Sequence, residues 1–330
     1  MKTCVIGGGS WGTAMAVHLA GMEKDVVVWN KFPEEIEEIV RLGENKKYLP
    51  GVKIPENIRF TCDMEAAVSD VSLIIFALPS PLTRMVAKEL SKYVKENTII
   101  VNLSKGLEKE NLKRLSEVLK EEIPNAKIVV MSGPSHAEEV ARKLPTTNVV
   151  ASEDKEAALF VQSFIMNENF RLYTADDVTG VELGGALKNV IALCAGISDG
   201  LGYGDNTKAA LMTRGLAEIK RLGVAMGANT ETFLGLSGMG DLIVTCTSMH
   251  SRNRRAGISL GKGKSLDETL KEIGMVVEGV NTASTALELS KKYNIQMPIV
   301  EEANKILFEG KSPLAAVNDL MTRDKTSEGK

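Results

Sequence analysis

Paired cysteines and an excess of positive charge are both lacking in this sequence. Its cysteines stand far apart in the chain, as Cys4, Cys62, Cys194 and Cys246. There is no CxxC pair and no histidine at metal-ligand spacing, so we expect free thiols, a reducing compartment and no metal centre. Forty basic side chains against 43 acidic ones leave a net charge of −3. This balance provides no cationic field for nucleic acid, which we exclude as a partner.

Long apolar runs are also lacking. The first apolar stretch reaches Gly7 within a few residues, which is too short for the core of a signal peptide. No run approaches the roughly 20 apolar residues of a membrane-spanning helix. We therefore expect a soluble, cytoplasmic protein without a membrane span. A chain of 330 residues with 44% hydrophobic and 25% charged residues is ordinary globular material and predicts two domains.

Short β-branched runs alternate with helical patterns in the first half, which is typical of a parallel sheet with crossover helices. Several runs are apolar throughout, as expected for strands covered by helices on both faces. We expect strands at residues 3–6, 26–29, 71–77, 98–101 and 127–131, and further strand-like runs at 148–151 and 170–173. We expect the intervening helices at residues 10–20, 33–42, 81–93 and 111–119.

The strand signal disappears after about residue 175, and apolar residues then recur at helical spacing. We expect helices at residues 178–197, 206–226, 282–293, 299–308 and 314–321. The sequence thus predicts an α/β fold with a Rossmann-type, mostly parallel sheet domain at residues 1–175. An all-α domain should follow at residues 176–330.

A glycine motif follows the first expected strand directly and precedes a helical pattern. Gly7, Gly9 and Gly12 have the spacing G-x-G-x-x-G. Gly7 permits a tight turn, Gly9 lets the backbone approach a pyrophosphate, and Gly12 lets helix and strand pack closely. The free N–H groups at the start of the helix then face the anion. This context predicts a dinucleotide site; the alternative is a glycine-rich turn without a ligand.

The choice between the two nicotinamide cofactors is normally read at the end of the second strand, where an acid binds the ribose and a base accepts a 2′-phosphate. Residues 28–32 (VWNKF) contain no acid there. Lys31 could pair with the phosphate, so the sequence leans modestly toward NADP over NAD. The alternative is that Lys31 is an ordinary solvated lysine.

Polar residues follow two expected strands whose ends should meet at the ligand crevice. Lys105 follows the strand that ends near residue 101, and Ser135 follows the strand that ends near residue 131. Lys105 can place a cation near a phosphate or a nicotinamide, and Ser135 can donate a hydrogen bond. Ordinary loop chemistry is the alternative for both residues.

Lys188 interrupts an almost charge-free helical pattern at residues 181–192. Its surroundings should be dry, and Gly184 and Gly185 one turn earlier leave room for a flat substrate beside the ammonium. Burial lowers the pKa of a lysine toward the working pH, which suits a group that gives a proton to a forming alkoxide. The alternative is a lysine that extends to solvent from an apolar helix.

A further cluster joins residues 237–242 (SGMGDL) to residues 251–255 (SRNRR). Ser251 has the features of a helix N-cap, and a guanidinium beside exposed N–H groups makes a compact phosphate clamp. Asp241 could orient a hydroxyl or the lysine. The alternative is a basic helix face with a capping aspartate.

Taken together in this order, these motifs resemble bacterial-type NAD(P)-dependent glycerol-3-phosphate dehydrogenase. The likeness runs from the first expected strand almost to the last helix. It rests on residues 7–13 (GGGSWGT), 104–106 (SKG), 132–136 (SGPSH), 182–189 (ELGGALKN), 213–216 (TRGL), 237–241 (SGMGD), 251–253 (SRN) and 277–280 (VEGV).

The resemblance implies reduction of dihydroxyacetone phosphate to sn-glycerol 3-phosphate for glycerophospholipid synthesis, with Lys188 as proton donor and acceptor. It also implies a homodimer. The implied substrate contacts are Lys105, Gly133, Ser135, Lys188, Asp241, Ser251, Arg252 and Asn253. With the glycine motif, the implied cofactor contacts are Gly7, Gly9, Ser10, Trp11, Gly12, Lys31, Lys105, Ala137, Arg252, Val276 and Glu278.

Two alternative functions remain open at this point. A related dehydrogenase acting on 6-phosphogluconate or a β-hydroxy acid would have a similar layout. Those enzymes typically carry an asparagine one turn after the lysine, where this sequence has Ala192. A dinucleotide-binding sensor without catalysis is the second alternative, and the retention of Lys188 beside a full set of anion contacts argues against it.

Overall fold

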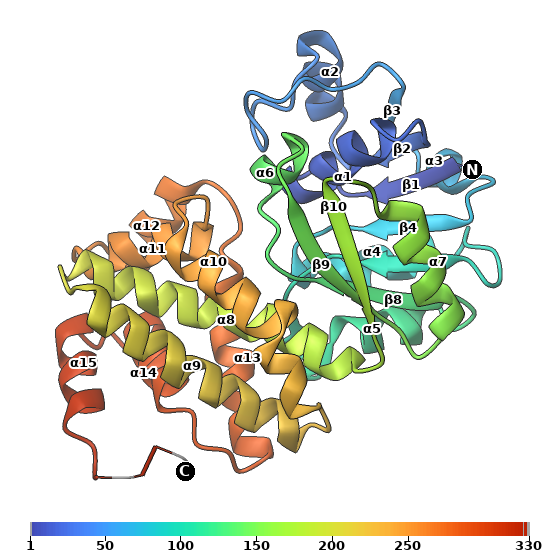
Figure 1. The fold of residues 1–330 in the computed structure, drawn as a ribbon. Coiled ribbons are helices and arrows are strands. Elements are labelled where there is room, and N and C mark those ends of the chain that lie inside the picture. Colours follow the sequence, from blue (N-terminus) through green and yellow to red (C-terminus); the bar gives the residue numbers. More distant parts are fainter. Residues whose placement is uncertain (1, 326, 329–330) are drawn as a thin grey trace.

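An eight-stranded sheet forms the first half of the chain in the computed structural model, which describes residues 2–325 and 327–328 (Figure 1). The strand order is β10-β9-β8-β5-β4-β1-β2-β3. Only the pair β8–β9 is antiparallel among these eight strands, so the predicted mostly parallel sheet is confirmed. The strands are β1 (Lys2–Ile6), β2 (Asp25–Trp29), β3 (Ile58–Thr61), β4 (Leu73–Phe76), β5 (Ile99–Asn102), β8 (Lys127–Ser132), β9 (Thr146–Ala151) and β10 (Phe170–Ala175).

Helices cover both faces of this sheet, and strand β4 shows why its sequence is apolar throughout. Leu73 and Ile75 pack into one core with α1 (Ser10–Ala20), whereas Ile74 and Phe76 pack into another with α4 (Thr83–Leu90) and α5 (Leu115–Glu122). Side chains alternate between the faces of a strand, so both sets must be apolar when both faces are covered. The helices of this half are α1 (Ser10–Ala20), α2 (Pro33–Leu42), α3 (Met64–Val68), α4 (Thr83–Leu90), α5 (Leu115–Glu122), α6 (Ala137–Ala141) and α7 (Lys155–Ile165).

Two expected helices differ from the observed ones. The helix expected at residues 81–93 is a 3₁₀ turn, η1 (Ser80–Leu82), followed by α4. The helix expected at residues 111–119 is wrong at its start, because residues 113 and 114 form β7 (Lys113–Arg114), which pairs with β6 (Leu107–Glu108). Helix α5 then starts two residues after Lys113, where Glu182 accepts hydrogen bonds from the N–H and hydroxyl of Ser116. Contacts distant in sequence therefore set this boundary.

The second half is helical, as predicted, and is built around α8 (Val178–Gly200) (Figure 1). Around it lie α9 (Asp205–Ala225), a 3₁₀ turn η2 (Thr230–Leu234), a π-helical turn η3 (Leu236–Gly240), α10 (Asp241–Thr247), α11 (Arg252–Gly261), α12 (Leu266–Ile273), α13 (Glu278–Lys292), α14 (Pro298–Phe308) and α15 (Pro313–Met321). The sequence predicted no apolar stretch long enough to span a membrane. Helix α8 corrects this expectation, because by length and composition it could cross a membrane. Its apolar stretch is 94% buried inside the protein, as in a core helix.

Helices α8 and α11 touch backbone to backbone through glycines. A Cβ atom on Gly257 would lie 2.0 Å from the carbonyl oxygen of Leu193, and one on Gly196 would lie 2.0 Å from that of Arg254. No side chain fits at either position. This contact fixes the start of α11 relative to α8, which carries Lys188, so it positions the site described below.

We predict that Gly257→Ala destabilises the protein by about 1–3 kcal/mol, because the added methyl group must push two helix backbones apart. This net cost already includes the gain of about 1 kcal/mol in helix propensity. Urea unfolding followed by circular dichroism measures the change. Gly21→Ala is the matched control, since Gly21 has helical φ and ψ at the end of α1 and a Cβ atom there would meet only ordinary contacts at 3.4 Å. Equal stability of the two variants would show that α8 and α11 separate at little cost.

Candidate active site

A cleft of about 870 Å³ lies between the sheet domain and the helical domain. Its walls include the glycine loop after β1, the ends of β2, β4 and β5, and parts of α8 and α11. Most of the sequence-predicted site residues line it, namely Gly7, Gly9, Ser10, Trp11, Lys31, Lys105, Ser135, Ala137, Lys188, Ser251, Arg252, Asn253, Val276 and Glu278. Three predicted residues do not line the cleft but contact residues that do. Gly12 packs against Gly7, Gly133 accepts hydrogen bonds from Lys105 and Ser135, and Asp241 accepts hydrogen bonds from Lys105 and Lys188.

The glycine loop fits the pyrophosphate of a dinucleotide. Gly7 has φ +113°, and a Cβ atom there would lie 2.6 Å from the carbonyl oxygen of Ala77. A Cβ atom on Gly12 would lie 1.9 Å from the carbonyl oxygen of Gly7, whereas nothing lies within 4 Å of that position at Gly9. Helix α1 begins at Ser10 without a side-chain cap, so its first N–H groups can receive an anion.

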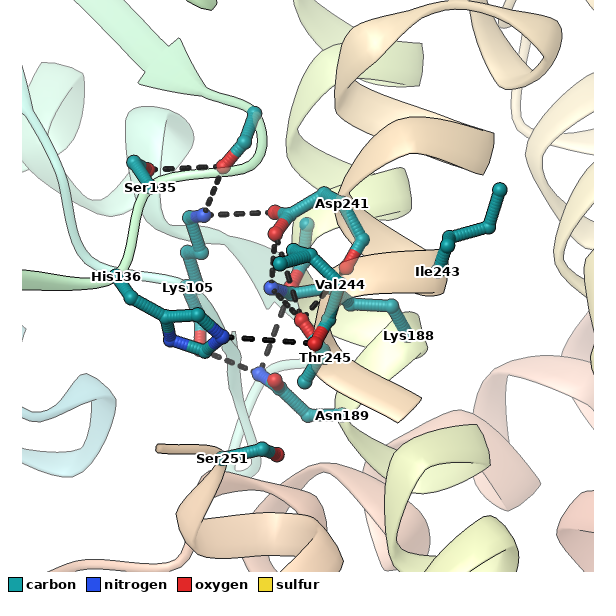
Figure 2. Close-up of polar contacts among 12 residues, drawn as sticks. Lys105, Ser135, His136, Lys188, Asn189, Asp241, Ile243, Val244, Thr245 and Ser251 are labelled. Atoms are coloured by element: carbon teal, nitrogen blue, oxygen red, sulfur yellow. Dashed lines mark hydrogen bonds and ion pairs between the residues drawn. The ribbon is translucent and has the colours of Figure 1, made fainter. Parts of the chain in front are cut away.

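Lys188 is buried, with 6% of its side chain exposed, and it is one of the residues that line the cleft. The ammonium donates hydrogen bonds to the Asp241 carboxylate and, over 2.7 Å, to Oγ1 of Thr245 (Figure 2). Lys105 donates to the other carboxylate oxygen of Asp241 over 2.7 Å. One carboxylate therefore joins two ammonium groups, and the expectation of a dry environment for Lys188 is confirmed. The alternative of a lysine extended into solvent is wrong.

Burial lowers the pKa of Lys188 to about 8, although the Asp241 carboxylate opposes this shift and raises it in part. The Lys105 ammonium lowers the pKa of Lys188 further. For Asp241, burial favours a higher pKa, but the two ammonium groups outweigh it and hold the pKa below its ordinary value. The pKa of Lys188 is therefore shifted from its ordinary value toward neutral pH, with the Asp241 carboxylate as its counter-charge.

The loop after β8 meets Lys105 from the sheet side. Lys105 Nζ and Ser135 Oγ each donate to the carbonyl oxygen of Gly133 over 2.9 Å. Gly133 has φ +144°, and a Cβ atom there would lie 2.3 Å from the end of the Asn148 side chain and 3.0 Å from its Cα atom. Glycine is therefore required where the chain turns to present Ser135 and His136. His136 also lines the cleft; sequence reasoning missed it, although it ends one of the quoted motifs.

Helix α11 begins at the cleft with Ser251 as its N-cap, as predicted, because the Ser251 hydroxyl accepts from the N–H of Arg254. Arg252 follows in the first turn, and its Nη1 donates to the carbonyl oxygen of Val276 over 3.1 Å. Asn253 donates to Asn189 on α8 over 3.0 Å. The arrangement holds a guanidinium beside a helix N-terminus, which suits a phosphate group.

Glu278 joins the helical domain to the sheet domain across the cleft. Its two carboxylate oxygens accept from the N–H of Ser80 over 2.8 Å and from the Ser80 hydroxyl over 2.5 Å. Burial raises the pKa of Glu278, and the bonds from Ser80 act in the opposite direction. The predicted cofactor contact is thus also a contact between the domains.

Sequence reasoning missed a group of residues beyond the end of β2. Glu35, Lys47 and Tyr48 line the cleft there together with Asn30. The sequence shows no acid at residues 28–32, but the first turn of α2 brings Glu35 into this region. The position of Pro33 at the start of α2 signalled this turn. Lys47 and Tyr48 come from a loop without a recognisable pattern.

A dinucleotide-type glycine loop on a Rossmann-type sheet, facing a buried lysine from a helical domain, defines the class of two-domain nicotinamide-dependent dehydrogenases. Comparisons with known proteins narrow this class. The model of the NAD-dependent glycerol-3-phosphate dehydrogenase N-terminus matches residues 2–158, and that of its C-terminus matches residues 177–318. The chain belongs to the NAD-dependent glycerol-3-phosphate dehydrogenase family.

Curated relatives and a crystal structure agree with this assignment. The glycerol-3-phosphate dehydrogenase [NAD(P)+] of Thermoanaerobacter sp. is 58% identical over 99% of both chains. That of Bacillus licheniformis is 56% identical over 99% of this chain and 96% of its own. The crystal structure of glycerol-3-phosphate dehydrogenase from Coxiella burnetii has a TM-score of 0.95 and 38% identity, and covers 98% of this chain and 99% of its own.

We predict that Asp241→Asn lowers the pKa of Lys188 below about 8, because the carboxylate that favours the ammonium form is lost. Titration of isotope-labelled methyl groups on the lysines, assigned with a Lys188→Arg variant, reports this pKa directly. Asp267→Asn on the surface of α12 is the control and should leave the titration unchanged. An unchanged Lys188 pKa in a folded Asp241→Asn protein would show that the carboxylate does not set it.

Proposed function

We propose that this chain catalyses the reversible NAD(P)H-dependent reduction of dihydroxyacetone phosphate to sn-glycerol 3-phosphate. The observation that carries the proposal is the buried amine of Lys188 in the same cleft as the glycine loop and Arg252. The names of the relatives support this substrate, because they are glycerol-3-phosphate dehydrogenases [NAD(P)+].

Lys188 acts as the proton donor in this proposal. When bound, the nicotinamide supplies the hydride in one direction and accepts it in the other. The Lys188 ammonium gives its proton to the oxygen of the ketone as this becomes an alkoxide, and the neutral amine takes the proton back in reverse. A pKa of about 8 suits both steps near neutral pH. Thr245 and Asp241 hold Nζ in place, and Lys188 lines the cleft.

The phosphate of the substrate is held at the start of α11 in this proposal. Arg252 and the free N–H groups of the first turn supply positive charge and hydrogen bonds where the net charge of the chain, −3, supplies none. Holding the phosphate fixes the carbonyl at the distance that proton and hydride transfer require. Ser135 and Lys105 border the same space from the sheet side.

The proposal extends to a cytoplasmic location, a role in supplying glycerophospholipid synthesis and a homodimer, all of which follow from the family resemblance. Light scattering coupled to size exclusion distinguishes a dimer from a monomer of 35.7 kDa. The decisive assay follows the oxidation of NADH and of NADPH with dihydroxyacetone phosphate. The same assay with ketone substrates of 6-phosphogluconate and β-hydroxy acid dehydrogenases tests the related reactions.

We predict that Lys188→Met lowers kcat for reduction by about 10²–10⁴-fold, because this is the typical contribution of a positioned proton donor. Methionine keeps the length and removes the charge. Binding of NADH, measured by fluorescence, should persist and shows that the cleft is intact. Lys220→Met on α9, outside the cleft, is the control. Near-normal kcat in Lys188→Met would refute the proton role.

We predict that Arg252→Ala raises KM for dihydroxyacetone phosphate about ten- to a hundred-fold, which corresponds to the loss of a charged hydrogen bond of about 1.5–3 kcal/mol. Initial rates at saturating cofactor give this KM. The control is Lys262→Ala at the far end of α11, where the side chain is exposed. If both variants bind the substrate as the parent protein does, the phosphate lies elsewhere.

A further inference from the structure

A second polar cluster occupies the cleft beyond the glycine loop, where β2 ends. It consists of Asn30, Glu35, Lys47 and Tyr48, and we refer to it as the Glu35 cluster. Its members come from the end of β2, the first turn of α2 and the loop after α2. All four line the same cleft as the glycine loop.

Glu35 is the centre of this cluster. Its Oε1 atom accepts from Lys47 Nζ over 2.7 Å and from the Tyr48 hydroxyl over 3.0 Å. Its Oε2 atom accepts from the Asn30 amide over 2.9 Å. An ammonium, a phenol and an amide thus converge on one carboxylate at the rim of a ligand cleft.

The ion pair between Glu35 and Lys47 can be rearranged by a ligand, because its two side chains differ in solvent exposure. Glu35 has 15% of its side chain exposed, whereas Lys47 has 55%. An ion pair with one partner in solvent is worth about 1 kcal/mol or less, so a ligand can rearrange it at little cost. Lys47 can turn on its flexible stem while Glu35 stays on its helix.

The position of the cluster indicates what it meets. In open parallel sheets of this type, the ribose that carries the 2′ substituent is read at the end of the second strand. A carboxylate there accepts a hydrogen bond from a 2′-hydroxyl and repels a 2′-phosphate. The three donors around Glu35 are the kinds of group that bind a phosphate.

We propose that the Glu35–Lys47 pair sets the ratio of NAD to NADP use, and that both residues are specificity determinants of the site. With NAD, Glu35 keeps its donors and accepts the 2′-hydroxyl. With NADP, Lys47, Tyr48 and Asn30 donate their hydrogen bonds to the 2′-phosphate instead of to Glu35. The exposed Lys31, which also lines the cleft, adds a second cation. This inference rests on the proposed function only in that the cleft binds a nicotinamide dinucleotide.

Two fragments differ only at the 2′ position, namely 5′-AMP and adenosine 2′,5′-bisphosphate. Isothermal titration calorimetry gives the Kd of each for the whole protein. Glu35→Gln removes the competing charge and should lower the ratio of the bisphosphate Kd to the 5′-AMP Kd about tenfold. Lys47→Met removes the cation and should raise the same ratio about tenfold. The KM ratio for NADPH and NADH should move in the same directions.

Glu34→Gln and Lys46→Met are matched controls, because both side chains are exposed neighbours that do not line the cleft. Equal shifts in both fragments, or none, in Glu35→Gln and Lys47→Met would overturn the proposal and leave the cluster a structural contact. Failure of the parent protein to reduce dihydroxyacetone phosphate with either cofactor would instead refute the proposed function. The binding ratios would still be interpretable in that case.

Discussion

The arrangement of the whole site depends on one buried carboxylate between two ammonium groups. Asp241 on α10 holds Lys188 from α8 and Lys105 from the loop after β5, so it ties the helical domain to the sheet domain. Buried charges must be paired, because removing one partner leaves the others uncompensated in a dry environment. Two cations against one anion leave one positive charge beside the cleft. An anionic substrate is drawn to this charge, and Lys188 can release it as a proton near pH 8.

Glycines determine where these charges stand. A Cβ atom on Gly184 would lie 2.5 Å from the carbonyl oxygen of Ser237, so α8 packs directly against the π-helical turn that leads into Asp241. The expectation that Gly184 and Gly185 leave room for a substrate is therefore wrong. Gly196 brings α11 onto the same helix in the same way, and Arg252 with it. Side chains at either glycine would push these segments away from Lys188. The apolar, glycine-rich composition of α8 is therefore a condition for the site and not only for the core.

The sequence predicted those parts of the structure that neighbouring residues in the chain determine. Strands such as β4 could be predicted because all their residues are apolar, and the burial of Lys188 because few other charges lie in the same apolar helix. The edge strand β3 was missed because it is short and mostly not buried. Helix α7 was missed although Asp154 gives it a regular N-cap. The start of α5 and the position of Glu35 beside the cleft were missed, because the first depends on Glu182 from α8 and the second on Lys47 from the loop after α2.

Each end of the cleft has a carboxylate that accepts hydrogen bonds from an ammonium group. The two ends differ in solvent exposure, and this difference determines the function that each can serve. Asp241 and Glu35 are both carboxylates saturated by an ammonium and further donors. The Lys188 side chain is 6% exposed, so its bond to Asp241 is weakly screened and a ligand cannot displace it cheaply. Lys47 is 55% exposed, so solvent already competes for its charge. A fixed geometry at the reacting end suits proton transfer, whereas an exchangeable pair at the other end suits the recognition of two related cofactors.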